Sequence, residues 1–247
     1  MGFRDHFSAQ AQQYAAYRPT YPRELAAFLA SAAPGRELAW DVATGQGQAA
    51  RLLASEFRHV VATDASAAQL ASAEPCDGVE FRVGEASESH LAAHGCDLVT
   101  AAQAAHWFDL PDFYDEVRRV LRPGGVIAIW GYVLLQTGNA AIDRRLEHFQ
   151  DVTVGPYWPP GREILQAHYT TIPFPFEPVP APRFFMRARW TRDNLIGYVG
   201  SWSAVARYRQ QHATDPLPAF VDEMREVWPD GQAYDIEWPL YLLVGCV

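Results

Sequence analysis

The residues best suited to hold a nucleoside-bearing ligand lie in the first third of the chain. Residues 39–47 read Ala-Trp-Asp-Val-Ala-Thr-Gly-Gln-Gly, an apolar run followed by a glycine-bearing turn. Gly45 and Gly47 lack a Cβ atom, so the backbone of this turn can approach a ligand closely. Asp64 ends a second apolar run, residues 60–63, and its carboxylate can accept hydrogen bonds from both hydroxyls of a ribose. This order predicts the nucleotide-binding half of a Rossmann-like α/β domain.

Two kinds of ligand fit that spacing. The sequence Gly45-x-Gly47-x-x-Ala50 satisfies the dinucleotide pattern, which would indicate a nicotinamide enzyme. Asp41, just before the turn, favours the other kind, a nucleoside that carries a cationic amino acid and no phosphate. An acid near the turn suits that positive end, and the loop then has no pyrophosphate to hold.

The turn Asp41-x-Ala43-x-Gly45-x-Gly47 resembles the first motif of class I S-adenosylmethionine-dependent methyltransferases. The resemblance implies S-adenosylmethionine as the cofactor, S-adenosylhomocysteine as its product, and binding by these four residues and Asp64. Ala43 stands where that family usually has its first glycine. The departure costs little only if the local φ angle is negative.

Two downstream segments extend the resemblance over residues 38–132. Residues 79–86 read as a third strand that ends in Gly-Glu-Ala, and the family meets the adenine there, which assigns Glu85 and Ala86. Residues 121–125, Leu-Arg-Pro-Gly-Gly, match a family segment that ends a helix before the fifth strand. We also expect Ala65, Ala101 and Gln103 to contact the cofactor.

The first 22 residues carry a signature of their own. Residues 7–22 resemble the opening of the type 11 branch of the family, and residues 106–109, His-Trp-Phe-Asp, occur in its relatives of trans-aconitate methyltransferase. We expect Tyr14, Arg18 and Tyr21 to close over the cofactor as a lid. Arg18 could grip a carboxylate of the cofactor or of the substrate. Alternatively, its guanidinium stacks on a neighbouring tyrosine and only holds the segment down.

His106 is the candidate catalytic residue. It follows the fourth expected strand, residues 97–103, at the edge where open α/β sheets bind ligands. Histidine could act as a general base toward a hydroxyl or amine, or it could only shape the pocket. A carboxylate acceptor would need no base, since it is already ionised at neutral pH. The predicted substrate-binding residues are Tyr21, His106, Trp107, Tyr157, Trp158 and Trp202.

An insertion from about residue 137 to residue 182 begins with a helical pattern at Ile142, Leu146 and Phe149. It then becomes rich in proline and aromatic residues, which disfavours regular helix or central strand in that later part. We expect it to cap the active site; a packed surface loop is the alternative. The substrate half, residues 133–247, also carries six arginines between residues 144 and 189. Some of them could form a positively charged entrance that attracts anions, while most are expected to be solvated. They are Arg144, Arg145, Arg162, Arg183, Arg187 and Arg189.

These residues require an α/β scaffold to position them. The expected elements are strands at 39–42, 60–63, 79–83, 97–103, 126–130, 184–190 and 238–244, and helices at 113–121, 192–202 and 216–228. The resemblance implies a seven-stranded, mostly parallel sheet with an antiparallel last strand between strands five and six, and helices on both faces. We expect one domain over residues 1–247, with a helical leader (1–37), a cofactor half (38–132) and a substrate half (133–247).

The composition of the chain limits the kinds of partner and compartment that we expect. The net charge of -9 over 247 residues opposes a nucleic-acid substrate, because phosphate binding needs a basic surface. The three cysteines indicate a reducing compartment, and His90 and His94 before Cys96 lack the remaining ligands of a metal site. No secretion signal is visible, and the apolar run at 240–247 is too short to span a bilayer, so we expect a cytoplasmic protein.

Together these features predict a methyltransferase that acts on a small molecule, with an oxygen of a carboxylate or hydroxyl as the acceptor. We expect no metal. The alternative from another class is a protein that binds S-adenosylmethionine without catalysis, such as a sensor or a partner subunit. An NAD-dependent oxidoreductase is a more distant alternative.

Overall fold

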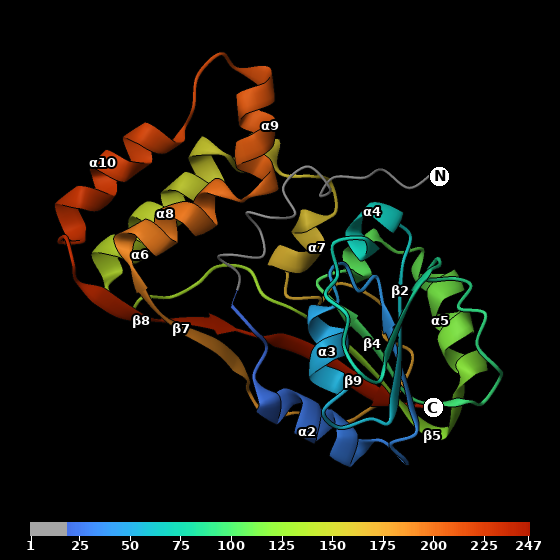
Figure 1. Cartoon of the computed structure of the whole chain (residues 1–247). Helices are drawn as coiled ribbons and strands as arrows, with labels where there is room; N and C mark the ends of the chain where they lie inside the picture. The colour runs from blue at the N-terminus through green and yellow to red at the C-terminus, as the bar shows by residue number, and fades with distance from the viewer. Residues whose placement is uncertain (1–18) are drawn as a thin grey trace.

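The computed structural model describes residues 19–247, and parallel strands form its centre (Figure 1). The main sheet has seven strands in the order β3-β2-β1-β4-β5-β9-β6. Strands β1 to β5 pair in parallel, whereas β9 is antiparallel to both β5 and β6. The strands are β1 (Leu38–Val42), β2 (His59–Asp64), β3 (Val79–Val83), β4 (Cys96–Ala102), β5 (Leu121–Gly131), β6 (Glu177–Pro178) and β9 (Tyr241–Cys246). The expected fold, with the last strand antiparallel between strands five and six, is confirmed.

Helices cover both faces of this sheet because alternate strand residues point to opposite sides. On β5, Ala128 and Trp130 join one buried cluster, and Ile127 and Ile129 join the other. The first cluster is completed by α2 (Arg23–Ala32) and α3 (Gln48–Leu53), and the second by α5 (Leu110–Val120). The short helix α4 (Ala67–Leu70) follows β2. The start of α5 is three residues earlier than expected, since Asp109 and a proline in the first turn begin it.

The expected sixth strand at residues 184–190 is wrong as a member of the main sheet. The strand exists as β7 (Phe185–Thr191), but it pairs antiparallel with β8 (Ala233–Pro239) in a separate two-stranded sheet. The sixth strand of the main sheet is instead the two-residue β6, inside the proposed insertion. Pro178 is tolerated there because β6 is an edge strand, which needs fewer backbone donors. The last strand also begins later than expected, at Tyr241, because Trp238 belongs to β8.

The two-stranded sheet supports a second layer of helices. In Figure 1, α6 (Ala140–His148), α8 (Arg192–Gly200), α9 (Ser203–Gln211) and α10 (Leu217–Val227) gather over β7 and β8, on the side away from α5. The helix α9 was not expected. The insertion further contains a π-helical turn (Phe149–Thr153), a 3-10 turn (Gly155–Tyr157) and α7 (Arg162–Gln166). In Figure 1, α7 lies between these helices and the carboxyl ends of the main strands.

Candidate functional site

The carboxyl ends of the parallel strands meet at one edge of the sheet, and the cofactor residues predicted from the sequence follow those ends. Asp64 is the last residue of β2 and is almost fully buried. Its Oδ2 accepts a hydrogen bond from the Gly45 amide at 2.8 Å, and its Oδ1 accepts one from the Ser66 amide at 2.8 Å. Each oxygen keeps a further lone pair, so an oriented carboxylate fits the two hydroxyls of a ribose.

The glycine-bearing turn leaves open backbone beside that carboxylate. Gly45 has a φ angle of 59°, and no heavy atom lies within 4 Å of the position that a Cβ atom would take. Gly47 has a φ angle of 79°, and a Cβ atom there would lie 2.6 Å from the ring of Phe81. The first glycine therefore leaves space for a ligand, and the second allows the turn to pack against β3. This cradle fits the nucleoside end of S-adenosylmethionine.

Ala43 lies in the left-handed region of backbone conformation, with a φ angle of 52°. Alanine would replace the family's glycine at little cost only if φ were negative. The positive φ angle shows that it does not. An L-residue with a Cβ atom costs about 1–2 kcal/mol in this conformation. The chain accepts strain at the first position of its cofactor motif.

Asp41 is fully buried beneath the turn. Its Oδ2 accepts a hydrogen bond from the Thr44 hydroxyl at 2.5 Å and its Oδ1 one from the Thr100 hydroxyl at 2.7 Å. Burial raises the pKa of Asp41 to about 6, although the two threonine hydrogen bonds act in the opposite direction. These contacts give the carboxylate a structural role, since they tie the turn to β4. Its contact with the cationic end of the cofactor stays a prediction.

The other predicted cofactor residues differ in exposure. Glu85 is exposed and Ala86 half-buried after β3, while Ala65 is half-buried after β2. Ala101 lies in the buried cluster on the α5 face, which leaves only its backbone near the strand end. Tyr14 and Arg18, and with them most of the proposed lid, lie outside the described residues.

Gln103 marks the end of β4 by its strained backbone, with a φ angle of 56°. Its Nε2 donates a hydrogen bond to the Tyr132 carbonyl at 2.9 Å. Its Oε1 is buried and has no hydrogen-bond partner among the described residues. A buried acceptor without a partner is costly in a folded protein, so this oxygen fits a ligand that carries an N–H or O–H donor.

A cavity of about 100 Å³ lies between the ends of β4 and β5 and the cap. It brings together four of the predicted substrate residues, His106, Trp107, Trp158 and Trp202. Its further lining residues are Gln103, Tyr132, Val133, Gln150, Pro159, Arg162, Leu165, Tyr198, Ser201 and Ser203. The proline- and aromatic-rich insertion supplies one wall, as a cap would.

Two predicted substrate residues do not line this cavity. Tyr21 is buried against Trp130, with ring centroids 5.5 Å apart. Tyr157 directs its hydroxyl to Nε2 of His212 at 2.5 Å and packs against α9. The structure thus places Tyr21 in the core and Tyr157 against α9. Because neither residue lines the cavity, their contacts with the substrate remain predictions.

His106 lies in the short 3-10 helix Ala105–Trp107 after β4. Its Nδ1 lies 3.1 Å from the hydroxyl of Tyr169. Burial, together with the positive charge of Arg162, lowers the pKa of His106 to about 4. The ring is therefore neutral at physiological pH.

Arg162 is held in the cavity wall by contacts of known geometry. Its guanidinium carbon lies 3.5 Å from the ring centroid of Trp158, and Nη2 donates to Oε1 of Gln150 at 3.0 Å. Trp158 Nε1 in turn donates to the Gln150 carbonyl at 3.1 Å. Stacking and a planar donor set make arginine suited to bind a carboxylate.

In the sequence, Arg162 is one of six arginines between residues 144 and 189. A four-residue spacing from Trp158 was the signal that could have singled it out. Two of the others form exposed ion pairs on β7, Arg187 with Glu237 and Arg189 with Asp235. Gln150, Tyr169 and Tyr198 carried no signal in the sequence.

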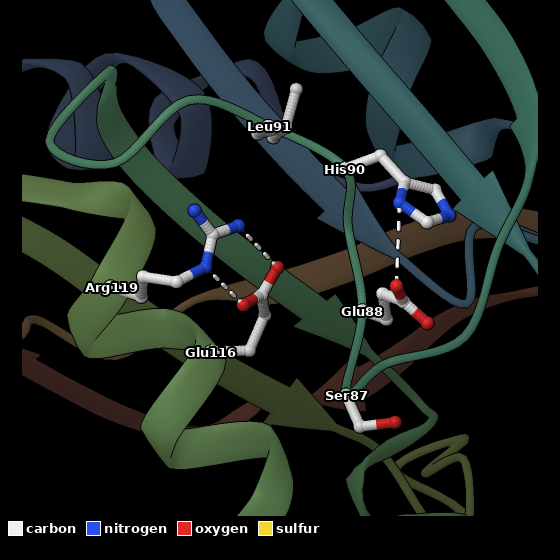
Figure 2. A pocket seen from close by; sticks show the side chains of 6 residues that line it. All are labelled: Ser87, Glu88, His90, Leu91, Glu116 and Arg119. Atoms are coloured by element: carbon white, nitrogen blue, oxygen red, sulfur yellow. Dashed lines mark hydrogen bonds and ion pairs between the residues drawn. The ribbon is translucent and has the colours of Figure 1, made fainter.

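A wider, open depression of about 620 Å³ lies between residues 87–91 and α5 (Figure 2). Its polar side chains face one another: Glu116 accepts a hydrogen bond from Arg119 of the same helix, and Nδ1 of His90 lies 3.6 Å from Oε1 of Glu88. Burial would raise the pKa of Glu116, but hydrogen bonds from Arg119 and Ser89 lower it to about 2. The carboxylate of Glu116 is already occupied by hydrogen bonds from Arg119 and Ser89, so the depression offers few polar groups for binding a ligand.

Residues 19–247 contain no group of three or more His, Cys, Asp or Glu side chains able to hold a metal ion. His94 Nδ1 lies 3.0 Å from the Leu121 carbonyl, and Cys96 is buried in the core. No helix in the described part of the chain is long and apolar enough to cross a membrane.

Known proteins similar to this chain are methyltransferases. Residues 40–129 match the family model of a methyltransferase domain. A Dictyostelium discoideum protein described as a methyltransferase is 32% identical over 98% of this chain and 95% of its own length. A Saccharomyces cerevisiae protein described as a probable S-adenosylmethionine-dependent methyltransferase is 28% identical over 88% of both chains. A solved Anaeromyxobacter dehalogenans structure, described as a type II methyltransferase, is 36% identical with a TM-score of 0.87, covering 93% of this chain and 98% of its own.

Proposed function

Because this chain belongs to the class I S-adenosylmethionine-dependent methyltransferases, we propose that its acceptor is a small organic acid, methylated at a carboxylate oxygen. The enzyme class and the cofactor follow from the family, and the acceptor is the new statement. When bound, S-adenosylmethionine supplies an activated sulfonium methyl; transfer to a carboxylate forms a C–O bond, breaks the C–S bond and releases no proton.

The observation that carries this proposal is the stacked, hydrogen-bonded Arg162 in a cavity at the sheet edge. A guanidinium held in place can orient a carboxylate by two parallel hydrogen bonds, which restricts the acceptor before transfer. Trp158 and Trp202 add apolar walls, so the acid should carry an apolar or planar body.

The cofactor would be held beside this cavity by the cradle that the sequence predicts. In the proposal, Asp64 accepts the ribose hydroxyls, Gly45 provides close backbone, and Glu85 with Ala86 meets the adenine. Gln103 Oε1 lacks a partner among the described residues and suits the ammonium of the methionine end. These residues bind and orient; none of them moves a proton.

The test is an acceptor panel assayed for S-adenosylhomocysteine formation. Each carboxylic acid is paired with the alcohol and the amine of the same skeleton, and tricarboxylates are included because residues 106–109 resemble relatives of trans-aconitate methyltransferase. We expect turnover of acids above their alcohols and amines. Turnover of alcohols alone would make a hydroxyl the acceptor, and cofactor binding without turnover of any member would favour a non-catalytic binder.

The variant Arg162→Gln tests whether Arg162 binds the carboxylate of the acceptor, and Arg187→Gln is the matched control. Both variants remove one arginine, but Arg187 lies on β7 in an exposed pair with Glu237. We expect Arg162→Gln to raise KM for the acid by about 10–100-fold and to leave S-adenosylhomocysteine affinity unchanged. Equal KM values in the two variants would contradict carboxylate binding by Arg162.

A further inference from the structure

Tyr169 and His106 form a pair beside the cavity, which His106 lines. Tyr169 is fully buried, and its hydroxyl lies 3.1 Å from Nδ1 of His106. The two residues are far apart in the chain, and the loop after α7 brings the tyrosine to the histidine. Burial raises the pKa of the Tyr169 hydroxyl, so it keeps its proton at every physiological pH.

The position of that proton decides what His106 can do. A buried hydroxyl hydrogen needs an acceptor, and within residues 19–247 the recorded partner of the Tyr169 hydroxyl is Nδ1 of His106. If the tyrosine donates to Nδ1, the proton of the neutral ring lies on Nε2. The opposite arrangement would leave the hydroxyl hydrogen buried without an acceptor, which disfavours it about tenfold or more.

We infer that Tyr169 holds His106 as the tautomer with its proton on Nε2, so that His106 donates a hydrogen bond to the oxygen of the acceptor. In this state His106 has no free nitrogen lone pair and cannot act as a general base. Tyr169 is then a positioning residue that acts through His106. The tautomer stands on its own, and the identity of the oxygen rests on the proposed carboxylate acceptor.

Backbone conformation supports a dedicated role for this tyrosine. His168 and Tyr169 both have left-handed φ angles, 55° and 59°. Two adjacent strained residues persist only where the surrounding structure compensates them, which is common at functional sites. At Tyr169 the strained backbone carries a bulky, fully buried side chain whose hydroxyl meets His106.

The surroundings of His106 also suit a donor to an anion. Among the described residues, the charged or titratable side chains recorded against the ring are Arg162 from α7 and Tyr169 from the following loop. Within residues 19–247, no carboxylate contacts the ring. A guanidinium and an Nε2–H group could therefore hold the two oxygens of one carboxylate, and an ionised acceptor needs no base.

The direct test is the ¹⁵N spectrum of the protein labelled in histidine. Protonated and unprotonated ring nitrogens differ strongly in ¹⁵N chemical shift, so the tautomer is visible without any substrate. We expect Nδ1 unprotonated and Nε2 protonated, unchanged from about pH 8 to about pH 5.5, across the usual histidine pKa. A protonated Nδ1, or titration near pH 6.5, would overturn the inference.

Tyr169→Phe removes the hydroxyl, and Tyr114→Phe is its matched control. Tyr114 is also a buried tyrosine, but its hydroxyl donates to the Pro173 carbonyl at 2.8 Å, outside the cavity. We expect mixed His106 tautomers in Tyr169→Phe and the wild-type tautomer in Tyr114→Phe. The same tautomer in all three proteins would show that Tyr169 does not set it.

A pair of His106 variants separates a donor from a base in turnover. His106→Gln retains an N–H group, whereas His106→Phe retains neither a donor nor a base. We expect His106→Phe to lower kcat/KM for an acid acceptor by about 10–100-fold and His106→Gln by clearly less. Equal losses would contradict a donor role, while an intact Nε2–H tautomer with no turnover of any acid would reject the proposed acceptor alone.

Discussion

Asp64 is a carboxylate that the backbone has already oriented. Its two oxygens accept the amides of Gly45 and Ser66, so little further ordering is needed when a ribose binds. We expect Asp64→Ala to weaken S-adenosylhomocysteine binding by about 1.5–3 kcal/mol, the range for hydrogen bonds to a charged group. Calorimetry measures this change, with the exposed Asp77→Ala as control. An unchanged Kd in a folded Asp64→Ala protein would mean that another group binds the ribose.

Asp41 makes stability depend on pH. Its pKa is about 6 in the folded protein against the usual 3.8, because burial disfavours the charged form. The folded state therefore binds more protons between pH 4 and 6, and this contribution to stability is full below pH 3.8 and lost as the pH rises through about 6. We expect Asp41→Asn, which stays neutral, to be more stable than wild type near pH 8 by about 1–3 kcal/mol.

Urea unfolding near pH 5 and pH 8 checks this prediction. The wild-type protein should lose stability between the two values more steeply than Asp41→Asn. Parallel pH dependence of the two proteins would mean that Asp41 is charged in the folded state, and thus that its burial is offset by stronger interactions.

Ala43 stores backbone strain in the cofactor turn. Its φ angle of 52° is one that glycine adopts freely. We expect Ala43→Gly to raise the free energy of unfolding by up to about 1 kcal/mol, since the relieved strain exceeds the extra entropy of the unfolded chain. Ala54→Gly, at a right-handed position with a φ angle of -62°, should lower it instead. Loss of stability in both variants would contradict strain at Ala43.

At the scale of elements, a buried carboxylate joins β1, β4 and β5 near their amino-terminal ends, opposite the cofactor site. Asp97, at the beginning of β4, accepts the amides of Glu37 and Leu38 at 2.8 and 3.0 Å. Its Oδ1 lies 3.0 Å from Nη1 of Arg122 on β5, and the carboxylate is fully buried. The arginine of the Leu-Arg-Pro-Gly-Gly segment thus has a structural reason to be present.

We expect Asp97→Ala to destabilise the protein by about 3–5 kcal/mol, because it leaves a guanidinium and two amides without their buried partner. Glu237→Ala is the control, since it breaks the exposed pair with Arg187 between β7 and β8 and should cost less than about 1 kcal/mol. Denaturant midpoints measure both changes. Similar losses in the two variants would contradict the anchoring role of Asp97.

At the scale of the whole molecule, one buried cluster joins the main sheet to the second helical layer. It includes Leu29 and Trp130 on the main-sheet side and Trp190, Trp228 and Trp238 on the other. Neither part can lose its partner without exposing large aromatic side chains to water. The structure therefore gives no reason for a boundary between the cofactor and substrate halves.

We expect both parts to unfold in one transition. Hydrogen exchange in increasing urea should report the same opening free energy for the amides of β1 and β4 as for those of β7 and β8. Far-UV circular dichroism and tryptophan fluorescence should give coincident midpoints. Earlier opening of β7 and β8 would divide the chain into two units and reject the single domain proposed for residues 1–247.

Local patterns in the sequence were sufficient for the cofactor half. A buried run, two glycines and an acid after the next strand lie within about 25 residues, and parallel strands bring such ends to one edge whatever the rest of the chain does. The strand order and the antiparallel last strand came from the resemblance to a family. Gly45, Gly47 and Asp64 accordingly lie at the carboxyl ends of the strands, as predicted, whereas the sign of φ at Ala43 and the burial of Asp41 required the structure.

Only the tertiary structure revealed which strand forms the edge of the main sheet and which residues line the acceptor cavity. Residues 184–190 have the pattern of a half-buried strand, but such a pattern reports burial and not the partner, so β6 and β7 could not be told apart as the sixth strand. Arg162 and Tyr169 are brought to His106, and Tyr198 to the same cavity, from separate elements by side-chain packing. No local spacing encodes such contacts, because the elements that make them lie far apart in the chain and meet only in the folded protein.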